Sequence, residues 1–302
     1  MSLVRRSLID TPDLSRDEII FLFDETRKLK GSTENRPLTH KSVALIFFEA
    51  STRTRTSFEM AAFRLGLRVL NLEATASSAQ KGETIFDTAR NIEALSPDAM
   101  VIRHSGSGIP AQISKLVKIP VINAGDGFHA HPTQALLDGF TIREKFGKIE
   151  GLKVLILGDI AHSRVARSNI HLLRMFGAKV TVCGPPTLIP PLATELGVEV
   201  KYNLDEVLHQ MDVVMVLRMQ MERQNSFQIP SLKEYTNRYG ITAERLAKIK
   251  SDAVIMHPGP VNRGVEMMSV ALRDPRCQVM DQVRNGVWLR TVLLREILGV
   301  NQ

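Results

Sequence analysis

The sequence predicts an α/β protein made of two doubly wound parallel sheets joined by a helix. Short apolar runs rich in β-branched residues alternate along the chain with segments whose apolar residues recur at helical spacing. The runs are apolar throughout, as expected for strands that are buried on both faces of a parallel sheet. Polar and basic residues gather where the runs end, and open α/β sheets bind their ligands outside the carboxyl ends of strands.

The elements follow in order from these patterns. The chain opens with a helix, because Ser15 and Glu18 form a capping box ahead of an apolar segment. Further helices are predicted from the segments "TQALLDGFTIREKFG", "HSRVARSNIHLLRMFG" and "VWLRTVLLREIL". Nine runs are predicted as strands: 43–48, 68–72, 99–103, 120–124, 153–158, 179–184, 198–202, 212–218 and 252–257.

A helix over residues 133–146 separates the strands into two sets. With 302 residues, the chain is long enough for two domains of about 150 residues each. We therefore predict one domain over residues 1–132 and a second over 133–285. The C-terminal helix, 286–302, is expected to pack back onto the first domain and complete it.

Composition excludes several classes of protein. No apolar leader and no 18-residue apolar span is present, so neither a signal peptide nor a membrane helix is expected. Two cysteines form no disulfide framework, which fits the cytoplasm. The net charge of +7 leaves a basic nucleic-acid-binding protein as an alternative, but the basic residues are dispersed and no nucleic-acid-binding motif occurs. A positive field that attracts small anionic substrates explains the charge equally well.

The stretch "FFEASTRTRTSFEMA" is predicted as a strand-to-helix turn. Ser51 or Thr52 would cap the helix, and Gly66 would end it at the C′ position. The first-turn N–H groups of a helix attract anions, and the guanidinium of Arg53 adds a bidentate donor suited to phosphate. The alternative is a capped surface helix whose arginines are solvated.

Basic residues follow several other predicted strands, which favours one ligand-binding edge per sheet. His131 precedes Pro132 and would lie at the start of the linking helix, although a plain helix cap is the alternative. No dinucleotide or P-loop glycine motif and no metal-ligand spacing occurs, so we expect neither a cofactor nor a metal. The polar residues at the strand ends are Arg103 and His104, Gly125 to Gly127 with His131, Asp159 with Arg164, Arg218 to Gln220, and His257 to Pro260.

Five segments in order, "FFEASTRTRTSFE", "KGETIFDT", "HPTQALLD", "LRMQMER" and "HPGPVNRG", resemble the aspartate and ornithine carbamoyltransferases. The resemblance runs from about residue 5 to the end of the chain. The last two segments are similar to those of the aspartate-specific members. The resemblance thus implies transfer of the carbamoyl group of carbamoyl phosphate to the α-amine of L-aspartate, a step of pyrimidine biosynthesis. Ornithine or another amino acid remains the alternative acceptor.

The resemblance also implies the site residues. For carbamoyl phosphate they are Ser51, Thr52, Arg53, Thr54, Ser77, Lys81, Arg103, His131, Gln134, Gly259 and Pro260. For aspartate they are Lys81, Arg164, Arg218 and Gln220. Catalytic roles fall to Arg53, Thr54, Lys81, Arg103 and His131, of which Thr54, Arg103 and His131 would donate to the carbamoyl oxygen.

The resemblance further implies that Ser77 and Lys81 reach the site of a neighbouring subunit in a cyclic homotrimer. Whether dihydroorotase joins a larger assembly stays open, and neither nucleic acid nor a membrane is expected as a partner. The bare sequence also allows Lys81 to be a solvated loop lysine, because it lies in the long polar segment 73–87. A cis peptide bond is predicted between Gly259 and Pro260, since tight turns at strand ends retain cis-proline and the resemblance implies one at this position.

Overall fold

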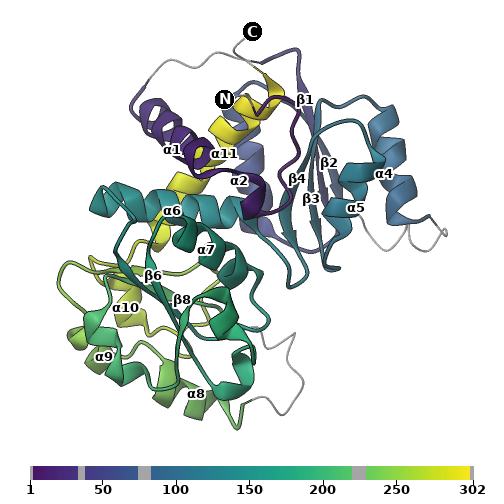
Figure 1. The fold of residues 1–302 in the computed structure, drawn as a ribbon. Coiled ribbons are helices and arrows are strands. Elements are labelled where there is room, and N and C mark those ends of the chain that lie inside the picture. The colour runs from purple at the N-terminus through teal and green to yellow at the C-terminus, as the bar shows by residue number, and fades with distance from the viewer. Residues whose placement is uncertain (1–2, 33–37, 74–82, 220–228, 300–302) are drawn as a thin grey trace. The chain divides into compact units, whose positions relative to one another are not determined.

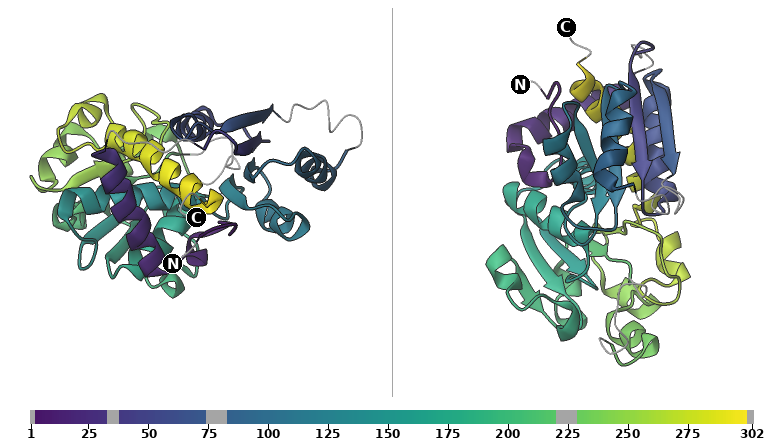
Figure 2. Two further views of the ribbon diagram at one scale, coloured as in Figure 1. Left: turned by 90° about the horizontal axis from the view of Figure 1, so that it is seen from above. Right: turned by 90° about the vertical axis from the view of Figure 1, so that its right-hand side faces the viewer.

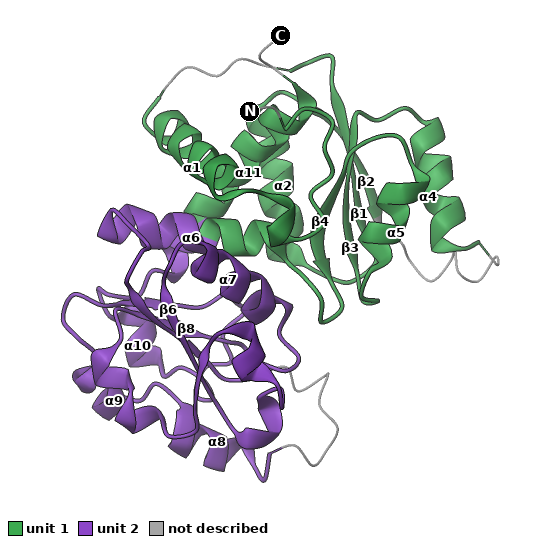
Figure 3. Cartoon of the chain, viewed as in Figure 1, with its two compact units in different colours: residues 1–137, 284–302 green, residues 138–283 purple. Residues whose placement is uncertain are grey.

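The computed structural model describes residues 3–32, 38–73, 83–219 and 229–299. The chain divides into two compact units, which Figure 3 distinguishes by colour: residues 1–137 with 284–302 form unit 1, and residues 138–283 form unit 2. Both divisions fall inside helices, α6 (Pro132–Phe146) and α11 (Val279–Leu298). The sequence placed the first division a few residues earlier, between 132 and 133.

Unit 1 contains a four-stranded parallel sheet in the order β2-β1-β3-β4 (Figure 1). The apolar runs of the sequence supply these strands because both faces of the sheet are covered by helices. The parallel α/β class predicted for this half is confirmed. The strands are β1 (Ser42–Phe47), β2 (Arg68–Glu73), β3 (Ala99–His104) and β4 (Val121–Asp126).

Helices α4 and α5 lie side by side over one face of this sheet (Figures 1 and 2). Ile92 of α4 and Ile113 of α5 are buried there against Ile46 and Ile102 of the strands. Helix α2 packs against β1 and β2 and buries Phe58. Among the described residues, the helices of unit 1 other than α6 and α11 are η1 (Thr11–Asp13), α1 (Arg16–Lys30), α2 (Thr52–Arg64), α4 (Ile85–Ala94) and α5 (Ile109–Leu116).

Two helix starts test the predicted caps. The capping box of α1 is confirmed, because Ser15 Oγ accepts from the N–H of Glu18 at 3.3 Å and the Glu18 carboxylate accepts from the N–H of Ser15 at 2.8 Å. The predicted side-chain cap of α2 by Ser51 is wrong. Ser51 occupies the N-cap position, but its backbone angles of φ −157° and ψ 84° do not turn its hydroxyl onto the first turn. At the other end Gly66 has the predicted left-handed conformation, with φ 66°.

Unit 2 contains a five-stranded parallel sheet in the order β7-β6-β5-β8-β9. One face packs against α8, α9 and the short turns before β8, where Leu155, Val214 and Tyr235 share a core. The α/β class predicted for this half is confirmed as well. Its strands are β5 (Lys153–Leu157), β6 (Lys179–Cys183), β7 (Glu199–Lys201), β8 (Val213–Val216) and β9 (Val254–Met256).

The helices of unit 2 follow the strands as a doubly wound fold requires. Helix α7 contacts β6 and buries Leu172 and Leu173. The longer helices are α7 (Arg164–Met175), α8 (Leu232–Tyr239), α9 (Ala243–Lys248) and α10 (Ser269–Arg273). Short 3₁₀ turns are η2 (Pro186–Leu188), η3 (Ala193–Leu196), η4 (Leu204–Glu206) and η5 (Leu208–Gln210). Within the described ranges, no helix has both the length and the apolar composition needed to cross a lipid bilayer.

Candidate functional site

Strand order identifies the point at the carboxyl edge of each sheet where α/β folds bind their ligands. In unit 1 the chain runs from β1 outward to β2 and then returns to β3 on the other side of β1, so the order of strands reverses between β1 and β3. In unit 2 the same reversal lies between β5 and β8. Connections on the two sides of such a switch point leave toward opposite faces and open a crevice between them. The predicted basic residues follow these four strands.

The turn from β1 into α2 presents donors for an anion. Thr52 and Arg53 are exposed, Ser51 is half-buried and Thr54 is buried. The N–H of Arg55 is bonded to the carbonyl of Ser51 at 3.1 Å, so the helix begins directly at the polar run. The start of α2 therefore combines the positive end of the helix dipole with the side chain of Arg53, a combination that favours phosphate binding.

Arg103 is the second-to-last residue of β3 and has contacts on both sides. Its Nη1 donates to the carbonyl of Ala124 on β4 at 3.4 Å, and its Nε lies 3.3 Å from a carboxylate oxygen of Glu49, which follows β1. The side chain is only 12% exposed. Glu49 was not among the predicted site residues, although an acidic residue two positions before a run of basic and hydroxyl residues is the signal that would have identified it.

His131 and Gln134 lie at the start of α6. The helix begins at Pro132, and the carbonyl of His131 accepts from the N–H groups of Gln134 and Ala135 at 3.0 and 3.2 Å. The predicted position of His131 at the helix start is confirmed. Both side chains are buried. Since β4 neighbours β3, His131 belongs to the same sheet edge as Arg103.

A buried arginine from the C-terminal helix connects α2 and α6 in unit 1. Arg290 of α11 donates to Ser57 Oγ in the second turn of α2 at 2.7 Å and to Thr133 Oγ1 in the first turn of α6 at 3.2 Å. It thereby links the N-terminal halves of the two helices. From its sequence, α11 was expected only to pack onto the first domain, and this role was not predicted.

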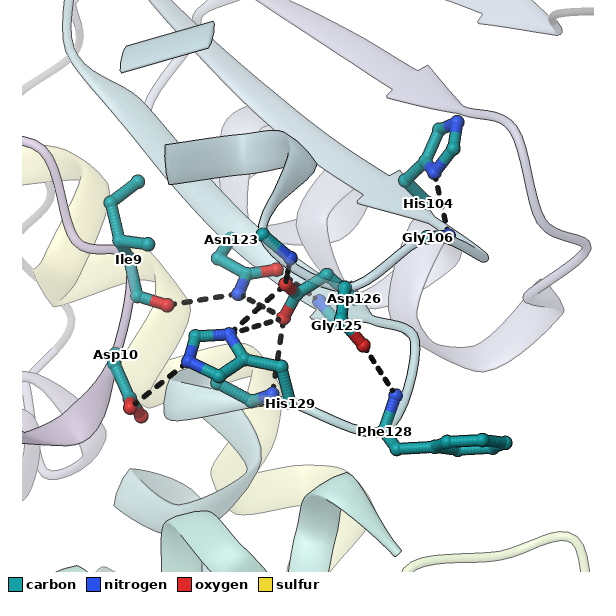
Figure 4. Close-up of polar contacts among 12 residues, drawn as sticks. Ile9, Asp10, His104, Gly106, Asn123, Gly125, Asp126, Phe128 and His129 are labelled. Carbon is teal, nitrogen blue, oxygen red and sulfur yellow. Dashed lines mark hydrogen bonds and ion pairs between the residues drawn. The ribbon is translucent and has the colours of Figure 1, made fainter. Parts of the chain in front are cut away.

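Asp126, which the sequence places among the strand-end residues without assigning it a role, has a buried carboxylate at the end of β4 (Figure 4). It accepts from the side-chain amide of Asn123 at 2.8 Å and from the N–H of Ala130 at 3.1 Å. The N–H of Gly108, in the loop after β3, donates to it at 2.6 Å. The signal was the sequence Gly-Asp-Gly at a strand end, which gives a carboxylate between two conformationally free residues.

In unit 2, Arg164 and Arg218 flank the switch point. Arg164 is the first residue of α7 and is buried, and the N-cap residue Ser163 accepts from the N–H of Ala166 at 3.1 Å. Arg218 follows β8 closely and is half-buried. The structure therefore places both predicted carboxylate-binding arginines at the carboxyl edge of this sheet.

The turn after β9 contains the predicted cis peptide bond between Gly259 and Pro260, which is confirmed. Nδ1 of the buried His257 accepts from the N–H of Gly259 at 2.8 Å, so its Nε2 carries the proton and donates to Glu266 at 3.3 Å. The same Glu266 oxygen accepts from the N–H of Asn262 at 2.6 Å. The Asn262 amide in turn donates to the carbonyl of Met219, next to Arg218, at 3.0 Å.

A chain of buried amides connects this turn to α7. The N–H of His257 donates to the side-chain oxygen of Gln282 at 3.0 Å, and the Gln282 amide donates to Asp138 at 2.8 Å. The other carboxylate oxygen of Asp138 accepts from Asn169 of α7 at 2.9 Å. The turn after β9 and the helix that begins with Arg164 are thus held by one network.

Two family models match nearly the whole chain. The model described as the carbamoyl-P binding domain of aspartate/ornithine carbamoyltransferase matches residues 6–144, and its Asp/Orn binding domain matches residues 150–297. The chain belongs to the aspartate/ornithine carbamoyltransferase family. The first model covers Ser51, Thr54, Arg103 and His131, and the second covers Arg164, Arg218, Gly259 and Pro260.

Relatives named aspartate carbamoyltransferase catalytic subunit include one from Myxococcus xanthus, 51% identical over 96% of this chain and 98% of its own length. A second, from Syntrophotalea carbinolica, is 47% identical over 99% of this chain and 97% of its own length. The crystal structure of aspartate transcarbamoylase from Trypanosoma cruzi in complex with carbamoyl phosphate and aspartate has a TM-score of 0.90 and 31% identity, covering 98% of each chain.

Three predicted site residues of this carbamoyltransferase chain lie outside the described residues: Ser77, Lys81 and Gln220. The others divide by unit. Unit 1 carries the predicted phosphate and carbamoyl donors, and unit 2 carries Arg164, Arg218 and the turn at Gly259 and Pro260. Each set lies at the carboxyl edge of its own sheet.

Proposed function

We propose that this chain transfers the carbamoyl group of carbamoyl phosphate to the α-amine of L-aspartate, giving N-carbamoyl-L-aspartate and phosphate. The observation that carries this choice is the pair Arg164 and Arg218 at the switch point of unit 2. Two guanidiniums suit the two carboxylates of aspartate and would repel the cationic side chain of ornithine. The relatives at about half identity carry the same specificity in their names. Membership of this enzyme family argues against the alternative function, that of a nucleic-acid-binding protein.

Unit 1 supplies the electrophile's binding site. The first turn of α2 with Ser51, Thr52 and Arg53 binds the phosphate, since its N–H groups and the Arg53 guanidinium are oriented donors for an anion. Thr54, Arg103 and His131 donate to the carbamoyl oxygen, where negative charge develops as the carbonyl carbon becomes tetrahedral. Removal of one such preorganised donor lowers kcat by about 10²- to 10³-fold in other enzymes.

Unit 2 supplies the acceptor site. Arg164 binds the α-carboxylate, and Arg218 with Gln220 binds the β-carboxylate. The neutral amine attacks the carbamoyl carbon, the bond from this carbon to the phosphate oxygen breaks, and the departing phosphate can accept the proton that the amine loses. Gly259 and Pro260 orient backbone carbonyls toward the carbamoyl NH₂ and the amine. Neutralisation by arginines lets two anionic substrates approach each other, so proximity contributes much of the rate.

Direct attack requires no covalent intermediate on the enzyme, and the cysteines agree with this. Burial raises the pKa of Cys183 to about 12, and burial likewise raises the pKa of Cys277. Neither is a thiolate at neutral pH, and the thiolate is the nucleophilic form.

The proposal extends to assembly and location. The family resemblance supports a cytoplasmic homotrimer in which Ser77 and Lys81 enter the carbamoyl phosphate site of a neighbouring chain. Dihydroorotase is the candidate partner of this trimer. Size-exclusion chromatography of the purified chain, alone and mixed with dihydroorotase, measures both.

The direct test is phosphate release from carbamoyl phosphate in the presence of L-aspartate or L-ornithine. We expect release with aspartate and turnover with ornithine that is lower by roughly 10²-fold or more, because a cationic side chain would be unpaired against Arg218. Equal or faster turnover with ornithine would overturn the assignment. N-(phosphonacetyl)-L-aspartic acid should inhibit more tightly than either substrate binds.

A further inference from the structure

The carboxylate of Asp126 makes several polar contacts, and none of them is with a predicted substrate-binding residue. Its carboxylate is fully buried. Oδ1 accepts from Asn123 Nδ2 at 2.8 Å and from the N–H of Ala130 at 3.1 Å, and Oδ2 accepts from the N–H of Gly108 at 2.6 Å. The ring Nδ1 of His129 lies 3.2 and 3.0 Å from the two oxygens (Figure 4).

These contacts join two loops that lie side by side at the sheet edge. The N–H of Gly127 donates to the carbonyl of His104 at 3.0 Å, and the N–H of Phe128 donates to Ser107 Oγ at 3.1 Å. Gly127 has φ 42°, and a Cβ there would lie 2.2 Å from Ser107 Oγ, so the close approach requires glycine. The loop after β3 and the loop after β4 therefore behave as one cross-linked pair.

Two of the three residues expected to donate to the carbamoyl oxygen flank this loop pair. Arg103 directly precedes the first loop, and His131 directly follows the second. The carboxylate of Asp126 lies between the loops and accepts from one N–H of each, at Gly108 and Ala130. A displacement of either loop would move a donor away from the position where charge develops.

We propose that Asp126 is a positioning residue for carbamoyl transfer, whose buried carboxylate sets the placement of Arg103 and His131 through the loops 104–108 and 126–130. This inference rests on the proposed function. The position requires an acceptor on both oxygens. In Asp126→Asn the amide NH₂ must face either Gly108 N–H or the donors of Asn123 and Ala130, and a donor opposite a donor pushes the loops apart.

Asp98 offers a matched control in the same unit. Its carboxylate accepts from the N–H of Ser42 at 2.8 Å and from Lys41 at 2.9 Å, but at the amino end of β1, the opposite edge of the sheet. Asp98→Asn therefore makes the same chemical change, beside a backbone N–H, without touching either loop. A loss that follows merely from replacing a carboxylate bonded to a backbone N–H would appear in both variants.

The experiment compares steady-state kinetics of the wild type, Asp126→Asn and Asp98→Asn with carbamoyl phosphate and L-aspartate. For Asp126→Asn we expect kcat to fall by about 10- to 100-fold, because oxyanion donors that are displaced lose part of their effect. The KM for aspartate should change by less than about twofold and the inhibition constant of inorganic phosphate by less than about threefold, since the sites for carboxylates and phosphate are built elsewhere. Asp98→Asn should keep kcat within about twofold of the wild type.

A spectroscopic measurement reads the contact itself. The amide proton of Gly108 donates to a carboxylate, and in an ¹⁵N-resolved spectrum of the wild type it should resonate far downfield. In Asp126→Asn it should move upfield, while the Ser42 amide stays in place. The converse is expected for Asp98→Asn.

The outcomes separate the two proposals. A wild type that does not carbamoylate aspartate contradicts the proposed function. An active wild type with an unchanged kcat in Asp126→Asn, or with equal losses in both variants, overturns the positioning role alone. If Asp126→Asn does not fold, Ser107→Ala is used instead. It removes the hydrogen bond from the N–H of Phe128 at an exposed residue of the same loop pair. Its kcat should fall about threefold at unchanged KM, and a kcat equal to that of the wild type overturns the role.

Discussion

The guanidinium of Arg103 owes its position to groups on two neighbouring strands. A β4 carbonyl accepts from Nη1, and the Glu49 carboxylate lies beside Nε. A planar fork can satisfy both partners and still direct a donor toward the crevice, whereas an ammonium cannot. The residue is thus held by its neighbours before any substrate arrives, which is the arrangement that electrostatic catalysis requires.

Replacement of Arg103 by lysine should keep the charge and lose the geometry. We expect Arg103→Lys to lower kcat by about 10²-fold, because one preorganised donor to the carbamoyl oxygen is lost. The free energy of unfolding should change by less than about 1 kcal/mol, since the charge still lies near Glu49. Kinetics and urea denaturation measure the two effects, and a kcat within a few-fold of the wild type would contradict the assigned role.

In unit 2, the buried carboxylate of Glu266 holds the turn after β9. One of its oxygens accepts from both Asn262 and His257. Glu266→Leu leaves two buried donors without an acceptor, and we expect it to lower the free energy of unfolding by about 2–4 kcal/mol. Glu266→Gln keeps an oxygen for both donors and should lower it by less than about 1 kcal/mol. Urea denaturation of both variants checks this, and equal losses would show that the acceptor is not the stabilising feature.

At the scale of elements, the starts of α1 and α2 differ in how they are capped. Ser15 caps α1 with its side chain, while Ser51 at the start of α2 makes no capping bond. A helix that binds phosphate benefits from this, because a side-chain cap would occupy N–H groups that the anion needs. The hydroxyl of Ser51 is then available to the ligand instead of the helix.

Replacement by alanine should therefore have different effects at Ser15 and at Ser51. We expect Ser15→Ala to lower the free energy of unfolding by about 1 kcal/mol with unchanged kinetics, as for other lost caps. Ser51→Ala should leave stability within about 0.5 kcal/mol and raise the KM for carbamoyl phosphate by about tenfold, because one neutral donor to phosphate is lost. Thermal or urea denaturation and kinetics of both variants measure this, and a stability loss confined to Ser51→Ala would contradict it.

Arg276 joins the ends of α9 and α10. It donates to the carbonyls of Leu246 and Ile249 and forms a bidentate pair with Asp274, with both distances 2.8 Å. The hydrogen bond from Arg276 lowers the pKa of Asp274 below its ordinary value of 3.8. A carboxyl whose pKa is lower in the folded state stabilises the fold above the unfolded pKa, and this contribution is lost as the pH falls through the folded pKa.

Asp274→Asn should accordingly show a stability difference that depends on pH. At pH 7 we expect the variant to be less stable than the wild type by about 1–2 kcal/mol. As the pH falls below the ordinary pKa of 3.8, the difference should shrink, because the wild-type carboxyl becomes neutral as well. Urea denaturation at several pH values measures it, and a difference that is constant down to the lowest pH would exclude the ion pair as its cause.

At the scale of the whole molecule, the resemblance implies an active site shared between two chains. Lys81 lies outside the described residues, and its partner in the neighbouring chain would be the phosphate bound at Arg53. We expect Lys81→Ala and Arg53→Ala each to be nearly inactive, while a mixture of the two regains activity. With random mixing in a cyclic trimer, about one site in four has an intact Arg53 and an intact Lys81.

The mixture also provides its own control. Subunit exchange is verified with differently tagged chains, and each variant is incubated alone under the same conditions. If both residues acted from one chain, no combination could restore a complete site. A mixture that stays inactive after verified exchange would end the shared-site proposal.

Much of the secondary structure could be predicted from local sequence. Each of the nine apolar runs overlaps a strand within the described residues, and the capping box of α1 and the position of His131 were predicted. The cis bond at Pro260 was predicted from the turn together with the family resemblance. Strand formation, capping and turn chemistry depend on neighbours within a few residues, so one sequence determines them. The motifs also determined the family, because several of them occur in order along the whole chain.

Strand order and the contacts of buried polar groups were decided only by the tertiary structure. The crevices arise where the order reverses, between β1 and β3 and between β5 and β8, and no local pattern specifies which strands become neighbours. Arg290 and Ser57 lie 233 residues apart in the chain, and Asp126 meets Gly108 across two loops. Such pairs form because a buried charge must find partners wherever the fold brings them, and that requirement acts through space rather than along the sequence.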